Sequence, residues 1–222
     1  MKLIKAKNYR ELSNLASKIV ISEIKKKPNL SVVFASGKTP LRLYKNLAKA
    51  CRKGVDFSKI KAFNLDELYP IDKNNRNSFY YYLYKNLFSK INIRKENIHL
   101  LNGKANPKVE CKSYENLLKK NKIDLMILGV GKNGHIAYNE PGSLRNSKTR
   151  LVKLAKQDYK KGKKQAVSVG ISTILNSKKL LLLASGKKKK EAIRHLLHGK
   201  ISEKWPVSFL RTHKKLIVIT NS

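Results

Sequence analysis

The chain has 222 residues, of which 41% are apolar and 29% are charged, a composition typical of a globular protein. Its formal net charge of +36 arises from 41 lysines and 9 arginines against 14 acidic residues. No apolar run approaches the roughly 20 residues of a membrane-spanning helix, and the opening stretch MKLIKAKNYRELSNL lacks the apolar centre of a secretory signal, so we expect a cytoplasmic protein without a membrane partner.

The chain alternates helical and strand-like segments. Helices are indicated by apolar residues at helical spacing and by end signals, such as Pro40 in a first turn, Asn77 or Ser78 as an N-cap, and Gly54 beyond a last turn. Strands are indicated by short apolar runs. In chain order we predict a helix at 8–27, a strand at 30–36, a helix at 39–54, a strand at 59–65, a helix at 77–88, a strand at 97–101, a helix at 108–121, strands at 123–130 and 150–155, a helix at 169–177, a strand at 179–185, a helix at 187–199 and a strand at 216–220.

The predicted strands are apolar along their whole length and are separated by helices. This pattern is typical of a mostly parallel sheet that is covered on both faces. No linker or repeat divides the chain, so we predict one doubly wound α/β domain over residues 1–222. Because such sheets bind ligands beyond the carboxyl ends of their strands, polar residues that follow strands are candidate site residues.

The stretch SGKTP follows the predicted strand 30–36 and opens a helix. Gly37 allows a tight turn, and Ser36, Lys38 and Thr39 supply donors beside the free N–H groups of the helix start. Together these groups favour an anion site that suits a phosphate. An ordinary turn with a threonine cap is the alternative, and the GxxxxGK[ST] spacing of a Walker A loop is absent.

Asp66 and Glu67 follow the predicted strand 59–65. Two carboxylates at the end of a strand are compatible with a general base, with a metal site or with a helix cap. The residues alone leave these three interpretations open.

The most apolar predicted strand, 123–130, leads into GKNGHIAYNEPG. Gly131 and Gly134 let the backbone turn sharply and approach a ligand closely. His135 is of the residue type best suited to moving protons near neutral pH, and a carboxylate from Glu140 could orient its imidazole. Asn133 lies two positions before His135, so an extended loop would point both side chains the same way. A histidine that caps a glycine-rich connection is the alternative.

Gly186 and a run of lysines, Lys187 to Lys190, follow the predicted strand 179–185. One of these lysines could bind a phosphate. A solvated run of charge at the start of a helix is equally compatible with the pattern.

The sequence indicates neither a metal nor a nucleic-acid partner. Cys51 and Cys111 lack a CxxC neighbour, so we expect two reduced thiols, and the histidines have no spacing that forms a zinc set. The positive charge could attract nucleic acid. However, lysine outnumbers arginine along the whole chain and no nucleic-acid-binding motif accompanies it, so we expect a solvated basic surface that attracts anionic substrates.

Five stretches between Ser31 and Ile219 resemble, in order and spacing, the glucosamine-6-phosphate deaminase family. They are FASGKTPLRLYKNL, FNLDELYPIDKNNRNSFYYYLYKNLF, IDLMILGVGKNGHIAYNEPGS, AVSVGISTILNSKKLLLLASGKKKKEAI and WPVSFLRTHKKLIVI. The sister 6-phosphogluconolactonase family is similar in SGKTP and in the GH segment, but it has Ser-Leu-Phe-Pro-like residues in place of Tyr138 to Pro141. The resemblance implies a Rossmann-like sheet and the conversion of D-glucosamine 6-phosphate and water to D-fructose 6-phosphate and ammonia, with no metal or organic cofactor.

The resemblance also implies roles for individual residues. Asp66 matches the proton acceptor, and the matching ring-opening group is Asn133, His135 and Glu140, although many longer members have aspartate where Asn133 stands. The residues that match phosphate-binding positions are Ser36, Gly37, Lys38, Thr39 and Lys189, with Lys188 one position away. Further residues implied to lie near the substrate are Glu67, Gly131, Gly134 and Arg150.

Two departures from the long members bear on assembly. The sequence stops at Ser222, without the C-terminal extension of the hexameric members, and a second phosphate-binding arginine cannot be identified. Arg150 follows Thr149 as in long members, where that arginine resembles an allosteric residue. We expect a monomer or a small homo-oligomer. A lactonase-like hydrolase and a non-enzymatic sugar-phosphate binder remain the alternatives.

Overall fold

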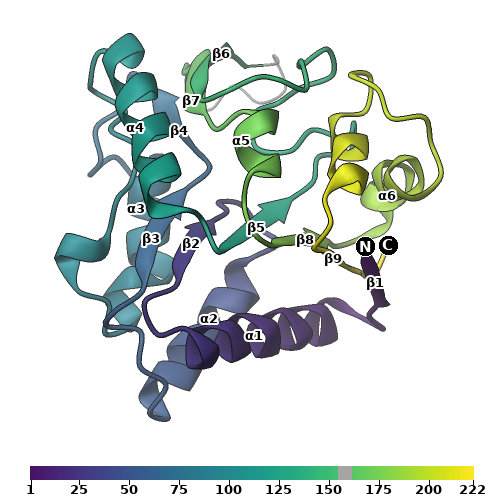
Figure 1. Ribbon diagram of the computed structural model, residues 1–222. Coiled ribbons are helices and arrows are strands. Elements are labelled where there is room, and N and C mark those ends of the chain that lie inside the picture. The colour runs from purple at the N-terminus through teal and green to yellow at the C-terminus, as the bar shows by residue number, and fades with distance from the viewer. Residues whose placement is uncertain (155–161) are drawn as a thin grey trace.

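A parallel sheet forms the centre of the protein, in a computed structural model that describes residues 1–154 and 162–222 (Figure 1). Its strands are β1 (Lys2–Lys5), β2 (Ser31–Phe34), β3 (Lys61–Asn64), β5 (Leu125–Gly129), β8 (Leu180–Ala184) and β9 (Leu216–Thr220). The six strands lie in the order β1-β9-β8-β5-β2-β3, and every neighbouring pair is parallel. The predicted mostly parallel α/β fold is therefore confirmed.

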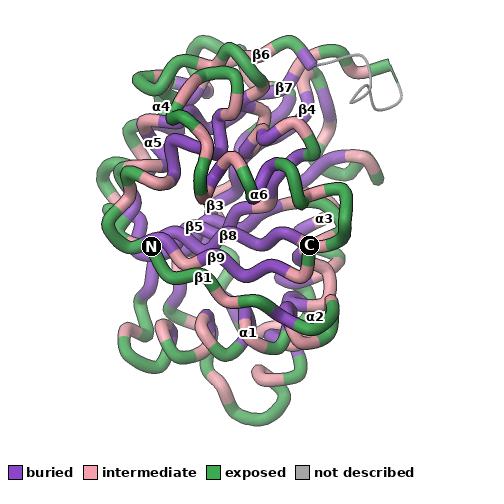
Figure 2. Tube along the Cα trace, turned by 90° about the vertical axis from the view of Figure 1, so that its right-hand side faces the viewer, coloured by how far each residue is buried: buried purple, intermediate pink, exposed green. Residues whose placement is uncertain are grey.

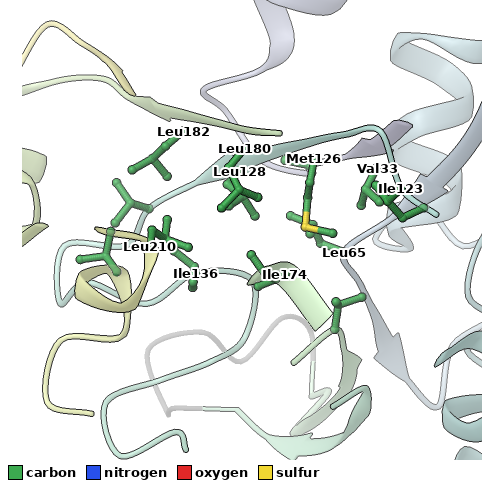
Figure 3. Close-up of a cluster of buried hydrophobic side chains, with 14 of the residues drawn as sticks. Val33, Leu65, Ile123, Met126, Leu128, Ile136, Ile174, Leu180, Leu182 and Leu210 are labelled. Carbon is green, nitrogen blue, oxygen red and sulfur yellow. The ribbon is translucent and has the colours of Figure 1, made fainter. Parts of the chain in front are cut away.

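The central strands are wholly apolar because each of them packs into two cores. Successive side chains of a strand point to opposite faces of the sheet. In β5, Leu125 and Ile127 enter one core, whereas Met126 and Leu128 enter the other. Figure 3 shows the second core, where Met126 and Leu128 lie opposite Ile174 from the helix Ile171–Leu175. β2, β5 and β8 are consequently buried along almost their whole length, as Figure 2 shows for β5 and β8.

Helices cover both faces of this sheet (Figure 1). On one face lie α1 (Tyr9–Lys26) and α2 (Leu41–Arg52), which share a core with α3 (Phe79–Asn86). On the other face lie α4 (Pro107–Asn121), α5 (Ile171–Leu175), α6 (Lys190–Leu197) and the 3₁₀ segment η5 (Pro206–Thr212). Shorter 3₁₀ turns are at Phe88–Lys90, Lys95–Asn97 and Lys187–Lys189. The sheet is doubly wound, as predicted.

The strand order places a ligand site beside β2. The chain leaves β2 to add β3 on one side, and it later adds β5 on the other side of β2. The loops that follow β2 and β5 therefore diverge at this point and leave a crevice at the carboxyl ends of the strands. Open α/β sheets bind their ligands at such switch points.

A second, antiparallel sheet lies above this edge of the molecule and was not predicted (Figure 2). It consists of β4 (Asp66–Tyr69), β7 (Gln165–Ser168) and β6 (Arg150–Lys153) in the order β4-β7-β6. Each strand has four residues and mixes polar with apolar side chains, so no long apolar run marks it. Asp66 opens a strand here, whereas the sequence suggested only that it follows one.

One strand prediction is wrong, one is confirmed over its described residues, and strand β1 was missed. The predicted strand 97–101 is reduced to one bridge between Ile98 and Ala62. The predicted strand 150–155 is observed as β6, and residue 155 lies outside the described part of the chain. β1 was missed because its sequence, KLIK, is short and half charged, and because it is an exposed edge strand whose pairing with β9 is supplied by tertiary structure.

Candidate active site

A cleft of about 920 Å³ opens at the carboxyl ends of β2, β5 and β8. Its walls come from the turn after β2, the start of β4, the glycine-rich loop after β5 and the lysine run after β8. The predicted site residues that line the cleft are Ser36, Gly37, Lys38, Thr39, Asp66, Gly131, Asn133, His135 and Lys189. The fold thus brings together residues from four separate stretches of the sequence.

Two tyrosines from α1 and α3 hold the turn 36–39 from outside. The Tyr9 hydroxyl lies 3.1 Å from the carbonyl oxygen of Lys38 and 3.0 Å from that of Thr39. The Tyr82 hydroxyl donates to the carbonyl oxygen of Gly37, whose φ of +107° favours glycine. With its carbonyl oxygens engaged by tyrosines, the turn is suited to presenting N–H groups to an anion. No local pattern in the sequence pointed to Tyr9 or Tyr82, because both act across long chain separations.

Asp66 and Glu67 point in opposite directions because they are neighbours in β4. Asp66 lines the cleft with 6% of its surface exposed, and the Ser36 hydroxyl lies 3.3 Å from its Oδ1. Glu67 faces away from the cleft and accepts hydrogen bonds from the Phe79 and Tyr80 amides, both at 2.9 Å, and from the Ser78 hydroxyl at 2.7 Å.

Glu67 is therefore a cap of α3 and does not line the cleft, and its implied place near the substrate stays a prediction. Burial raises the pKa of the Glu67 carboxyl, while the hydrogen bonds from Phe79, Tyr80 and Ser78 act in the opposite direction. Of the three interpretations that the sequence left open, the helix cap fits Glu67 and an accessible base fits Asp66.

His135, Glu140 and Asn133 form one contact group at the end of β5. The imidazole Nδ1 of His135 lies 2.9 Å from Oε1 of Glu140. Asn133 donates from Nδ2 to Oε2 of Glu140 at 2.7 Å and accepts from the His135 amide at 3.3 Å. Glu140 lies behind His135 and is not part of the cleft wall. The carboxylate therefore orients the imidazole, and Asn133 fixes the carboxylate.

The surroundings of Glu140 favour its charged form. Burial acts to raise the pKa of Glu140, but hydrogen bonding and charge at His135, together with the amide of Asn133, outweigh it and lower the pKa below the ordinary 4.5. Because the folded-state pKa is depressed, the ionised carboxylate stabilises the fold above pH 4.5, and this stabilisation is lost as the pH falls through the folded-state pKa.

The depressed pKa of Glu140 predicts how its contribution to stability depends on pH. Below pH 4.5, the difference in unfolding free energy between the wild type and Glu140→Gln should shrink steadily as the pH falls, because Glu140 becomes neutral in both states. Denaturant-induced unfolding of both proteins at a series of pH values measures this difference in unfolding free energy. A difference that grew on acidification through this range would contradict the depressed pKa.

Gly131 is required by the position of His135. A Cβ added at Gly131 would lie 2.4 Å from both Cε1 and Nδ1 of the imidazole, which is closer than any real contact. The imidazole therefore sits directly over the Gly131 backbone, whose amide also donates to the His135 carbonyl oxygen at 2.8 Å. Only glycine leaves room for this arrangement.

We expect Gly131→Ala to lower kcat by about 10²-fold, because a methyl group would push the imidazole out of place by about 1 Å or more. Steady-state kinetics of the purified variant measures this effect. Gly129→Ala is the matched control, because its added methyl group would meet no atom within 4 Å. Equal losses of kcat in Gly131→Ala and Gly129→Ala would show that displacement of His135 is not the cause.

Arg150 and Gly134 also lie outside the cleft wall. Arg150 donates from Nη1 to Oδ1 of Asn139 at 2.8 Å, and its Nη2 lies 3.3 Å from the Ser143 hydroxyl. Burial lowers the pKa of the Arg150 guanidinium. Arg150 therefore supports the loop on both sides of Glu140, and its implied place near the substrate stays a prediction.

The cleft wall also contains an aromatic pair and further lysines. Phe79 and Tyr138 are stacked, with ring centroids 6.1 Å apart and an interplanar angle of 26°. Lys132, Lys187 and Lys188 add positive charge to the wall that Lys189 shares. Tyr138 lies in the motif that distinguished the two sister families, but its pairing with Phe79 depends on the packing of α3 against the loop.

Within residues 1–154 and 162–222, no group of three or more His, Cys, Asp and Glu side chains is arranged to hold a metal ion. In the same described ranges, no helix is both long and apolar enough to cross a membrane. Cys51 and Cys111 are both free thiols, and Cys111 is buried.

Comparison with known proteins assigns the chain to a family. Residues 5–218 match the family described as glucosamine-6-phosphate isomerases/6-phosphogluconolactonase. The glucosamine-6-phosphate deaminase of Clostridium novyi (strain NT) is 44% identical over 232 residues, with 99% of this chain and 96% of the relative covered. The corresponding deaminase of Clostridium acetobutylicum is 41% identical, with the same coverage of 99% and 96%.

Solved structures agree with this assignment. A monomeric glucosamine-6-phosphate deaminase matches with a TM-score of 0.96 and 36% identity, covering 99% of this chain and 97% of that one. The 6-phosphogluconolactonase of Thermotoga maritima matches with a TM-score of 0.81 over 99% and 98% of the two chains, but at 22% identity it shows the shared fold alone. The chain therefore belongs to the family of glucosamine-6-phosphate isomerases and 6-phosphogluconolactonases.

Proposed function

We propose that the protein is a glucosamine-6-phosphate deaminase, which converts D-glucosamine 6-phosphate and water to D-fructose 6-phosphate and ammonia. The observation that carries this function is that His135 and Asn133, both bonded to Glu140 behind them, line a cleft that also contains Asp66. Relatives of that name, 44% and 41% identical along nearly the whole chain, support the same activity.

Ring opening is assigned to His135. The cyclic sugar must lose the proton of its C1 hydroxyl and gain one on the ring oxygen. An imidazole can carry out both transfers near neutral pH. Glu140 holds the imidazole through Nδ1, which leaves Nε2 for the substrate, and it supports the positive charge that forms on the ring. Asn133 is neutral and orients Glu140 without moving a proton.

Isomerisation is assigned to Asp66. In the open sugar the C2 proton is acidified by the adjacent aldehyde. Asp66 removes this proton while a proton of the substrate's ammonium group passes to the aldehyde oxygen, which gives an enolamine. Asp66 then delivers its proton to C1, which leaves a C1 hydroxymethyl group and an iminium group at C2. Water adds to the iminium carbon and ammonia leaves, giving the C2 ketone. The position of Asp66 in the cleft, with little of its surface exposed, is suited to this role.

Phosphate binding is assigned to the turn Ser36 to Thr39 and to Lys189, which face the same cleft. Binding energy at the phosphate then holds C1 and C2 near the reacting groups. The basic charge of the chain favours the approach of this dianionic group.

Ammonia release from D-glucosamine 6-phosphate by the purified protein is the direct test, read beside hydrolysis of 6-phosphogluconolactone under the same conditions. We expect ammonia and fructose 6-phosphate in equal amounts, and no lactonase activity above background. Lactone hydrolysis without ammonia release would support the lactonase alternative. Tight binding of sugar phosphates without turnover would support a non-enzymatic binder.

We further propose that residues 1–222 act as one domain in a cytoplasmic protein, and that the assembly is a monomer. A match with TM-score 0.96 to a deaminase described as monomeric supports this assembly. Sedimentation velocity at catalytic and higher concentrations tests it, and a stable hexamer would overturn it.

A further inference from the structure

The sequence contains one tryptophan, Trp205, and its indole lies behind the loop that carries His135. Trp205 is not among the residues that line the cleft. A Cβ added at Gly134 would lie 2.7 Å from Cε3 of the indole, so the six-membered ring packs against the Gly134 backbone. Gly134 has a φ of +82°, a conformation that favours glycine. The indole therefore supports the chain one residue before His135.

The segment around Trp205 is also hydrogen-bonded to both ends of this loop. The Val207 amide donates to the Gly134 carbonyl oxygen at 2.8 Å, and the Gly142 amide donates to the Glu203 carbonyl oxygen at 2.9 Å. The loop that contains His135 and Glu140 thus rests on residues 203–207 at two points, with the indole between them.

The indole is stacked in turn on α6. The rings of Trp205 and His195 have centroids 3.8 Å apart and an interplanar angle of 13°. His195 is itself confined: its Nε2 lies 3.1 Å from Oε1 of Glu191, and a Cβ added at Gly199 would lie 2.7 Å from its Nδ1. These contacts hold the His195 imidazole in one position, and the Trp205 indole stacks on it.

α6 also leads back to the phosphate end of the cleft. The turn Lys187–Lys189 lines the cleft and continues directly into α6. At about 1.5 Å per residue, His195 lies roughly 9 Å along the helix from Lys189. A short, rigid helix and two stacked rings thus connect the lysines of the cleft to the backbone beneath His135.

We propose that Trp205 is a positioning residue, which couples the position of α6 to that of the His135 loop through the stack His195–Trp205–Gly134. When a phosphate group binds beside the turn Lys187–Lys189, this stack then holds His135 and Glu140 in position. This inference rests on the proposed deaminase function. Small displacements matter, because a shift of about 1 Å in a reacting group can cost roughly 10²-fold in rate.

The first test is independent of turnover. Because Trp205 is the only tryptophan in the sequence, its fluorescence reports on the stack alone. We expect inorganic phosphate and, without ammonia, fructose 6-phosphate to change the emission saturably. In His195→Leu, fructose 6-phosphate should still bind within about 3-fold of the wild type by calorimetry, but the emission change should be lost. Binding without an emission change in the wild type, or an unchanged response in His195→Leu, would overturn the coupling.

The second test uses kinetics. Trp205→Phe keeps a ring that can stack, whereas Trp205→Leu does not. We expect kcat within about 3-fold of the wild type for phenylalanine and a loss of about 10-fold or more for leucine, with KM little changed in both. Lys204→Ala, at an exposed neighbour, is the control and should match the wild type.

Equal losses in the phenylalanine and leucine variants, or a loss confined to KM, would contradict a positioning role. If Trp205→Leu does not fold at the assay temperature, the fluorescence comparison with His195→Leu decides the question. If the wild type releases no ammonia, the proposed function fails, while the fluorescence test still decides whether the stack responds to a bound phosphate.

Discussion

Asp66→Asn is expected to lower kcat for ammonia release by about 10²–10⁴-fold, the range of general base catalysis. Asparagine is nearly isosteric with aspartate and keeps an oxygen within reach of the Ser36 hydroxyl, which lies 3.3 Å from Oδ1. The carboxamide cannot accept a proton from C2. The loss should therefore appear in kcat, with little change in the binding of fructose 6-phosphate.

Two controls separate chemistry from folding. Thermal unfolding of Asp66→Asn should stay close to that of the wild type, because the hydrogen bond from the Asn64 side chain goes to the Asp66 backbone. In deuterated water, the wild type should exchange a C1 hydrogen of fructose 6-phosphate when ammonia is present, and the variant should not. Unchanged ammonia release would show that Asp66 is not the base.

His135→Gln is expected to lower kcat with the cyclic substrate by about 10²-fold or more, because glutamine cannot shuttle a proton between the C1 hydroxyl and the ring oxygen. An analogue that lacks both the C4 and the C5 hydroxyl cannot close a five- or six-membered ring and stays open. With such an analogue, the variant should lose much less activity, since the step assigned to His135 is no longer needed.

Asn133→Ala is the matched comparison for His135→Gln. It removes the 2.7 Å hydrogen bond to Glu140 but leaves the imidazole and its carboxylate partner in place. We expect a smaller loss, of about 10-fold, again for the cyclic substrate alone. If His135→Gln reduced the rates of both substrates equally, the ring-opening role would be wrong, and a general effect on binding or folding would replace it.

Much of the fold could be predicted because its signals are local. β5 and β8 are apolar on both faces, and this identifies a covered parallel strand without any knowledge of its neighbours. The same logic located Ser36 to Thr39 and His135, since both follow such strands. β4 and β7 carry no such signal, because four-residue strands with mixed side chains depend on partners that are distant in sequence.

The candidate site shows the same division. The sequence grouped Asp66 with Glu67, but alternation along β4 sends one carboxylate into the cleft and the other to the start of α3. The family resemblance implied that Arg150 lies near the substrate, and only the folded chain shows that its guanidinium is bonded to Asn139 in the loop that follows His135. The direction in which a side chain points, and the groups it contacts, depend on the folded backbone and cannot be deduced from neighbouring residues in the sequence.

By itself the sequence determined the class of fold, the strand ends at which chemistry gathers, and the residue types that move protons and bind phosphate. Those features follow from hydrophobic periodicity and from side-chain chemistry, which each residue carries with it. Tertiary structure alone decided which groups meet: Tyr9 and Tyr82 on the phosphate turn, and Trp205 between His195 and Gly134. Such contacts depend on where strand order and helix packing bring distant residues, and no local pattern encodes that.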